Sequence, residues 1–162
     1  MSETADKVLV LGLGNDILTD DAAGLFVARE VGRRLAGHAN VEVHETTEMG
    51  LTLLDFMVGY HALVLVDSIQ TGQAEPGFIH EIDGADLKRL PTRTPHFLGV
   101  GETLALGRQL GLTMPARVKI IAIEVEDPFT LGTEMSPTLQ QALGAAVERV
   151  MKAVQELAKP RA

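Results

Sequence analysis

The 162-residue chain has no cysteine, no tryptophan and a single tyrosine. Without cysteine it can form neither a disulfide framework nor a zinc–thiolate site, so the usual sequence support for a secreted, disulfide-dependent protein is missing. No apolar run is long enough to span a membrane, and the first residues, MSETADK, lack the pattern of a signal peptide. We therefore expect a cytoplasmic protein with no membrane partner.

Basic side chains are also scarce. The chain has 14 Lys and Arg against 22 Asp and Glu, which gives a formal net charge of −8. Nucleic-acid binding depends on basic side chains that neutralise phosphates, so we expect no nucleic-acid partner. The nucleophile elbow G-x-S-x-G, the zinc motif H-E-x-x-H and the P-loop are absent as well. Carboxylates, histidine and a metal ion remain as the groups that can carry chemistry.

The length fits a single domain over residues 1–162, with residues 1–6 and 159–162 expected to be flexible ends. Short apolar runs alternate with helix-compatible segments, which favours an α/β sheet covered by helices on both faces. The predicted strands span residues 8–11, 41–45, 62–66, 77–83 and 118–123, and the fourth has the alternation of an edge strand compatible with an antiparallel direction. The predicted helices span residues 19–37, 50–58, 97–110 and 136–158, and residues 84–95 are predicted to form a long loop.

The stretch KVLVLGLGNDILTDDAAG, from Lys7 to Gly24, predicts a buried strand, a glycine-rich turn at Gly12 and Gly14, and a helix start at Asp20 and Asp21. It is a poor dinucleotide fingerprint, because the third glycine is missing and the acidic pair faces the position of a phosphate. A site rich in carboxylates calls for a cation instead. The helix that follows is predicted to bury an apolar stripe at Phe26, Val27, Val31 and Leu35.

Acidic side chains follow most of the predicted strands, at the sheet edge where open α/β sheets bind ligands. Crowded carboxylates raise one another's pKa unless a cation relieves the repulsion. His96 lies in the long loop just before a helix, within reach of the same crevice. Two carboxylates and one imidazole suit a divalent ion such as nickel or zinc. The acidic residues at this edge are Asp16, Asp20, Asp21, Glu48, Asp67, Glu124 and Glu126.

Each candidate also has a purely structural interpretation. Asp20 and Asp21 are equally well explained as N-cap residues, and His96 as an ordinary loop histidine. Asp67 stands out because a charge that directly ends an apolar strand is costly to bury. Solvated strand ends explain Glu48 and Glu124, and backbone turns explain Gly12, Gly14 and Gly50. The remaining histidines are interpreted as surface or sheet residues: His38, His44, His61 and His80.

Taken together, these segments resemble the hydrogenase maturation proteases, endopeptidases that trim the C-terminal extension from the large subunit of nickel–iron hydrogenases. The resemblance spans nearly the whole chain and is strongest in GLGNDILTDDAAG. It continues through MGLTLLD, LVLVDSI, TPHFLGV and the IEVED and MSP segments. We claim no catalytic role for Asp16, which is not a general feature of that family.

The resemblance implies that Asp21, Asp67 and His96 are the metal ligands and catalytic residues. It implies a three-layer α/β/α sandwich of phosphorylase/hydrolase type, with a mostly parallel, twisted sheet of about five strands. The partner would be a large-subunit precursor whose inserted nickel is the recognition signal; another divalent cation could replace it in vitro. Nickel or an aspartate would activate the scissile bond or the water, and both routes stay open. The candidates of second rank are Gly14, Asn15, Asp20, Glu48, Gly50 and Glu124.

Two departures and two alternatives accompany this interpretation. Asp21 stands where family members carry glutamate or aspartate, and Glu48 stands where a glycine or small residue is common. Peptidyl-tRNA hydrolase shares the GLGN turn on a related architecture, but it continues with proline and glycine and is basic where this chain is acidic. The second alternative is an adaptor without enzymatic activity that escorts the nickel-loaded precursor.

Overall fold

The computed structural model describes residues 7–15, 20–48, 50–89, 95–126 and 136–158, without the side chains of residues 21, 87–89 and 95–98. The ends that we expected to be flexible, and Asp16, lie outside these residues. None of the helices in the described ranges is long and apolar enough to cross a membrane.

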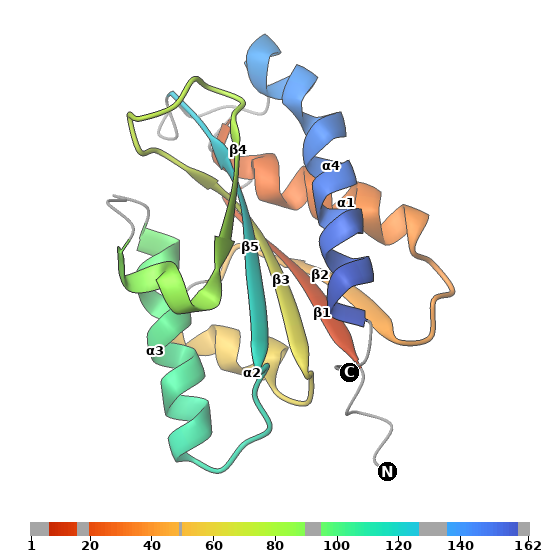
Figure 1. Cartoon of the computed structure of the whole chain (residues 1–162), viewed down its shortest axis with the longest axis vertical. Helices are drawn as coiled ribbons and strands as arrows, with labels where there is room; N and C mark the ends of the chain where they lie inside the picture. Colours follow the sequence, from red (N-terminus) through yellow and green to blue (C-terminus); the bar gives the residue numbers. More distant parts are fainter. Residues whose placement is uncertain (1–6, 16–19, 49, 90–94, 127–135, 159–162) are drawn as a thin grey trace.

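The described chain forms one five-stranded sheet with the strand order β2-β1-β3-β5-β4 (Figure 1). Four strands are parallel, and β4 lies at the edge, antiparallel to β5. This confirms both the mostly parallel sheet and the antiparallel edge strand. The strands are β1 (Val8–Leu13), β2 (Val41–Thr46), β3 (Ala62–Ile69), β4 (Ile79–Asp83) and β5 (Arg117–Glu124).

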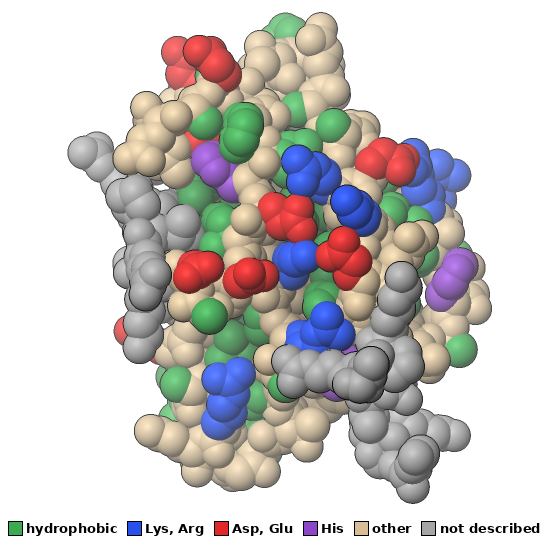
Figure 2. Space-filling view, viewed as in Figure 1, with side chains coloured by type: hydrophobic (Ala, Val, Ile, Leu, Met, Phe, Trp, Pro, Cys, Tyr) green, Lys and Arg blue, Asp and Glu red, His purple; other side chains and the backbone are tan. Residues whose placement is uncertain are grey.

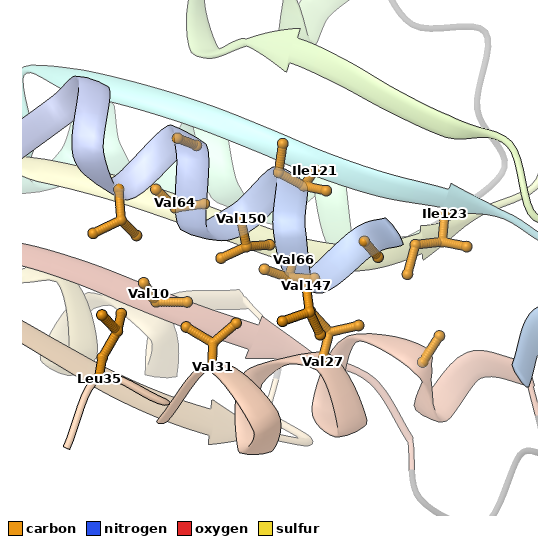
Figure 3. Packing of buried hydrophobic residues seen from close by; sticks show 14 of the residues in the cluster. Val10, Val27, Val31, Leu35, Val64, Val66, Ile121, Ile123, Val147 and Val150 are labelled. Carbon is orange, nitrogen blue, oxygen red and sulfur yellow. The ribbon is translucent and has the colours of Figure 1, made fainter. Parts of the chain in front are cut away.

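Helices cover both faces of the sheet, as the predicted sandwich requires. On one face, α1 (Ala23–Arg34) and α4 (Pro137–Ala158) pack on a core of branched side chains from β1, β3 and β5 (Figure 3). On the other face, α2 (Leu54–Met57) and α3 (Pro95–Gln109) pack on the leucines of β1 and β3. Every residue of β1 and β3 is buried, because both strands have neighbours on both sides and helices on both faces.

Three short 3-10 helices complete the described elements: η2 (Asp20–Ala22), η3 (Gly50–Leu53) and η4 (Gly84–Arg89). The long loop predicted for residues 84–95 is therefore wrong over its first half. Phe26 does not belong to the buried stripe of α1, since it is 39% exposed and its ring lies 5.1 Å from the guanidinium carbon of Arg29. The other predicted members of that stripe, Val27, Val31 and Leu35, are buried.

Gly12 and Gly24 allow α1 to lie directly on the ends of β1 and β3. Gly12 lies inside β1, so its predicted place in a turn is wrong. A Cβ at Gly12 would come within 2.5 Å of the Gly24 carbonyl oxygen, and a Cβ at Gly24 within 2.5 Å of the Val66 carbonyl oxygen. Only glycine fits at both positions, and this contact brings the start of α1 to the carboxyl ends of the two central strands.

We predict that Gly24→Ala lowers the free energy of unfolding by roughly 2 to 3 kcal/mol, because the added methyl group overlaps backbone atoms that cannot move aside. Urea denaturation measures the change. Gly144→Ala is the matched control: Gly144 lies in α4 with no atom within 4 Å of the added methyl group, so the helix should gain about 0.5 to 1 kcal/mol. Equal effects of the two substitutions would refute the packing argument.

Candidate functional site

Asp67 lies within β3 and is completely buried. The strand continues beyond it to Ile69, three residues further than the predicted strand 62–66. Alternate residues of this strand, Leu63, Leu65 and Ile69, pack in the core under α2 and α3. Asp67 has the same parity, so its carboxylate points to that face, where Oδ1 accepts a hydrogen bond of 2.7 Å from the Ser68 amide. The structure therefore places a carboxylate at the carboxyl end of a central strand.

The turn η2, which contains Asp21, contacts β3. Gly24, in the first turn of the α1 helix that follows, lies against Asp67: the position of its missing Cβ lies 3.1 Å from the Asp67 Cα atom. The backbone that carries Asp21 is thus held close to Asp67. The side chain of Asp21 lies outside the described atoms, so its role stays a prediction.

His96 is the second residue of α3, and the prediction that it precedes the helix in a loop is wrong. The first turns of α3 pack against the turn at Gly50. A Cβ on Gly99 would lie 3.2 Å from the Gly50 Cα atom, and the Thr103 hydroxyl donates to the Gly50 carbonyl oxygen at 3.3 Å. Gly50 has φ +71°, which confirms its predicted role in a turn. The imidazole of His96 is not among the described side chains.

Asp20 has a structural partner that lies 116 residues further along the chain. Its buried carboxylate accepts hydrogen bonds from the amide of Ser136 at 2.9 Å and from its hydroxyl at 3.1 Å. The Ser136 hydroxyl also accepts from the Leu139 amide at 3.4 Å, as an N-cap does at the start of α4. The N-cap of α1 is Ala22, without a side-chain bond, so Asp20 does not cap its own helix as predicted. It fixes the beginning of α4 against the beginning of α1.

Glu124 is only 2% exposed, so its interpretation as a solvated strand end is wrong. Its carboxylate accepts hydrogen bonds from the Thr71 amide at 2.8 Å and from the Thr71 hydroxyl, and it lies 2.9 Å from His80 Nε2. Burial by itself would raise the pKa of Glu124, but these hydrogen bonds outweigh it and the pKa is lowered. His80 therefore contacts a buried carboxylate in addition to its place in the sheet. No local sequence pattern predicts the pair of His80 and Glu124.

The remaining candidates contribute less. The Glu48 side chain is exposed, as predicted, and its amide donates to the Thr46 hydroxyl at 3.0 Å. Gly14 is buried without a positive φ, and Asn15 is half-buried. Among the described side chains, no group of three His, Asp or Glu residues is arranged to hold a metal ion. Of the predicted metal ligands Asp21, Asp67 and His96, only Asp67 has a described side chain. The metal site formed by these three residues therefore remains a prediction.

Comparisons of the sequence and of the structure with known proteins point to the same family. The model of the HycI family, described as hydrogenase maturation protease, matches residues 26–153. The chain is 26% identical to the hydrogenase 2 maturation protease of Escherichia coli over 152 residues, 93% of this chain and 92% of that protein. It superposes on the solved E. coli endopeptidase HybD with a TM-score of 0.82, covering 93% of both chains at 26% identity. A [NiFe] hydrogenase maturation protease HybD from Thermococcus kodakarensis gives a TM-score of 0.70 at 28% identity, covering 91% of this chain and 99% of that one.

We predict that the buried Glu124 makes the unfolding free energy depend on pH. Its pKa is lower in the folded protein than the 4.5 of an unperturbed glutamate, so the unfolded chain takes up a proton first on acidification. The stabilisation is complete above that value and is lost as the pH falls through the folded pKa. Urea denaturation from pH 7 downwards should show a shallower acid loss for Glu124→Gln than for the wild type. The exposed Glu126 supplies the control, Glu126→Gln, which should keep the wild-type slope; three identical slopes would contradict the assignment.

Proposed function

We propose, since the chain belongs to the hydrogenase maturation protease family, that it is an endopeptidase acting on the large-subunit precursor of a nickel–iron hydrogenase. In this proposal it removes a C-terminal extension after nickel insertion, in the cytoplasm, and recognises the precursor through its nickel. The observation that carries the proposal is the buried Asp67 carboxylate at the carboxyl end of β3, beside the turn that contains Asp21.

The position of the buried Asp67 in the sheet supports a functional role. Its place at the carboxyl end of a central parallel strand is the position at which α/β sheets bind ligands. Asp20 and Glu124, the other buried carboxylates of this edge, accept hydrogen bonds from distant segments and are explained as structural groups.

The backbone positions of Asp21 and His96 are compatible with a shared site. η2 contacts β3, the strand that carries Asp67. Position 96 precedes Val100 by one helical turn, and Val100 is buried in the core beneath α3, on the sheet face to which Asp67 points. Ala22 of η2 is buried in the core of the opposite face, so the two segments approach the same end of the sheet from its two faces.

Two carboxylates and an imidazole are a suitable donor set for a divalent ion with open coordination positions. In the proposal the ion is the nickel of the precursor, so it arrives as part of the substrate. Held at this edge, it would place the scissile bond next to Asp21 and Asp67. Either the ion polarises the scissile carbonyl group or one of the aspartates accepts a proton from the attacking water, and the substitutions below test the residues that both routes require.

We predict that Asp67→Asn and His96→Ala each lower the rate of precursor processing at least about 100-fold, as expected when a group that handles the metal or the proton is lost. The assay incubates each variant with nickel-loaded precursor and measures the mass of the large subunit. Asp55→Asn, which removes an exposed carboxylate from α2, is the control and should process normally. Full processing by either site variant would disprove the assignment, whereas an intact large subunit with the wild-type chain would favour the adaptor.

We further predict that processing requires nickel in the precursor. Precursor prepared without nickel should stay uncleaved and should bind the wild-type chain more weakly, because a metal ligated by both partners adds affinity only when it is present. Loading the same preparation with nickel should restore both cleavage and binding. Equal cleavage with and without nickel would show that the ion is not the recognition signal.

A further inference from the structure

A cavity of about 660 Å³ lies at the opposite end of β5 from the candidate site. Its walls are the start of β5, the C-terminal half of α3, the turn at Gly84 and the end of α4. Val118, in its wall, precedes Ala122, the partner of Asp67 in the sheet, by four residues, which corresponds to roughly 13 Å along an extended strand. The cavity is therefore separate from the carboxyl edge that carries Asp67, and its volume is within the range of ligand sites.

The cavity lining has a small excess of positive charge in a chain whose net charge is −8. Three cationic side chains line it, Arg108, Arg117 and Lys119, against two acidic ones, Asp83 and Glu156. Its apolar lining comes from Leu104, Val118, Leu157 and several alanines. An occupant that combines carboxylates with apolar side chains would match this lining.

Lys119 is already neutralised by its neighbours. Its Nζ lies 2.8 Å from a Glu156 carboxylate oxygen and 2.9 Å from one of Glu81, which also pairs with Arg149 at 2.8 Å. Both acids raise the pKa of Lys119. Figure 2 shows acidic and basic side chains mixed across the middle of the face on which β4, β5 and α4 lie.

The two arginines are not neutralised in this way. Arg108 donates from Nη2 to the Pro115 carbonyl oxygen at 3.1 Å, which leaves its charge without a carboxylate partner among the described residues. Arg117 makes no side-chain hydrogen bond or ion pair within the described part of the chain. Two guanidinium groups, each with several donors in a fixed plane, are well suited to carboxylates.

The apolar part of the lining favours a peptide as the occupant. The edge of β5 is not open to a further strand here, because β4 pairs with it from Lys119 onward and the turn at Gly84 packs on Val118, with the position of the missing Gly84 Cβ 2.7 Å from the Val118 Cβ atom. An acidic peptide can place carboxylates at the two arginines and apolar side chains against Leu104 and Leu157. A compact small anion can use only the arginines.

We infer that this cavity, here called the Arg108–Arg117 pocket, is a docking site for an acidic peptide segment of the protein substrate, away from the site of cleavage. The inference rests on the proposed function, because it takes the substrate to be a protein that must be bound as well as cut. Docking at this distance increases affinity for the precursor without contributing to bond cleavage. Arg108 and Arg117 are thus positioning residues.

The test separates binding from chemistry. Arg108→Ala combined with Arg117→Ala should raise KM for the nickel-loaded precursor roughly tenfold, since each exposed charge pair contributes modestly, and should leave kcat unchanged. The loss should shrink at high salt, where surface charges are screened. Arg33→Ala removes the same charge from the exposed face of α1 and should leave both constants at the wild-type values. The single variant Arg117→Ala keeps the hydrogen bond from Arg108 to the Pro115 carbonyl oxygen. It therefore still tests the pocket if the double variant fails to fold.

Direct binding identifies the occupant. Fluorescein-labelled peptides that tile the precursor, measured by anisotropy, should include an acidic one that binds the wild type and loses affinity in Arg117→Ala. Wild-type KM in both pocket variants would overturn the inference, and so would tight binding of free citrate at the pocket with no effect on precursor binding. If instead the wild type fails to cleave the precursor at all, the proposed function fails, while the peptide measurement still tests the pocket.

Discussion

The close contact between Gly24 and the carbonyl groups at the ends of β1 and β3 is the constraint on which the candidate site depends. A helix normally stays at side-chain distance from the sheet that it covers. Here the absence of a side chain at Gly12 and Gly24 lets the backbone of α1 rest on the backbone of the strands. The turn before α1 is thereby held next to Asp67, and with it the position of Asp21. The site is thus located by the packing of backbone atoms.

The same edge is held from the other face by α3. Gly99 and Thr103 contact the turn at Gly50, so the beginning of α3 is fixed by the turn that follows β2. The Thr103 hydroxyl shares its single proton between the Gly50 carbonyl oxygen and the Gly99 carbonyl oxygen, which lies 2.6 Å away within the helix. Three segments distant in sequence therefore meet at one end of the sheet through small residues and hydrogen bonds to backbone atoms.

The sequence was sufficient for features set by local pattern, and insufficient for those set by distant partners. Continuous apolar runs identify β1 and β3 because strands buried on both faces need apolar residues throughout. The alternation of residues 77–83 identifies the half-exposed edge strand β4. Asp20 and Glu124 were misjudged because Ser136, Thr71 and His80, which satisfy them, are 116, 53 and 44 residues away. Gly12 was assigned to a turn because a glycine needed for close packing and one needed for a turn look alike in a sequence.

The two ends of β5 differ in charge, and the distance between them determines whether groups at one end can affect a ligand bound at the other. Acidic groups gather at the carboxyl edge, and the Arg108–Arg117 pocket lies roughly 13 Å from the level of Asp67 along the strand. In the proposed function, an extended acidic segment bound in the pocket orients the rest of a protein substrate. If binding at the pocket and cleavage at the carboxyl edge use opposite ends of the same sheet, as proposed, substitutions can change the two steps independently.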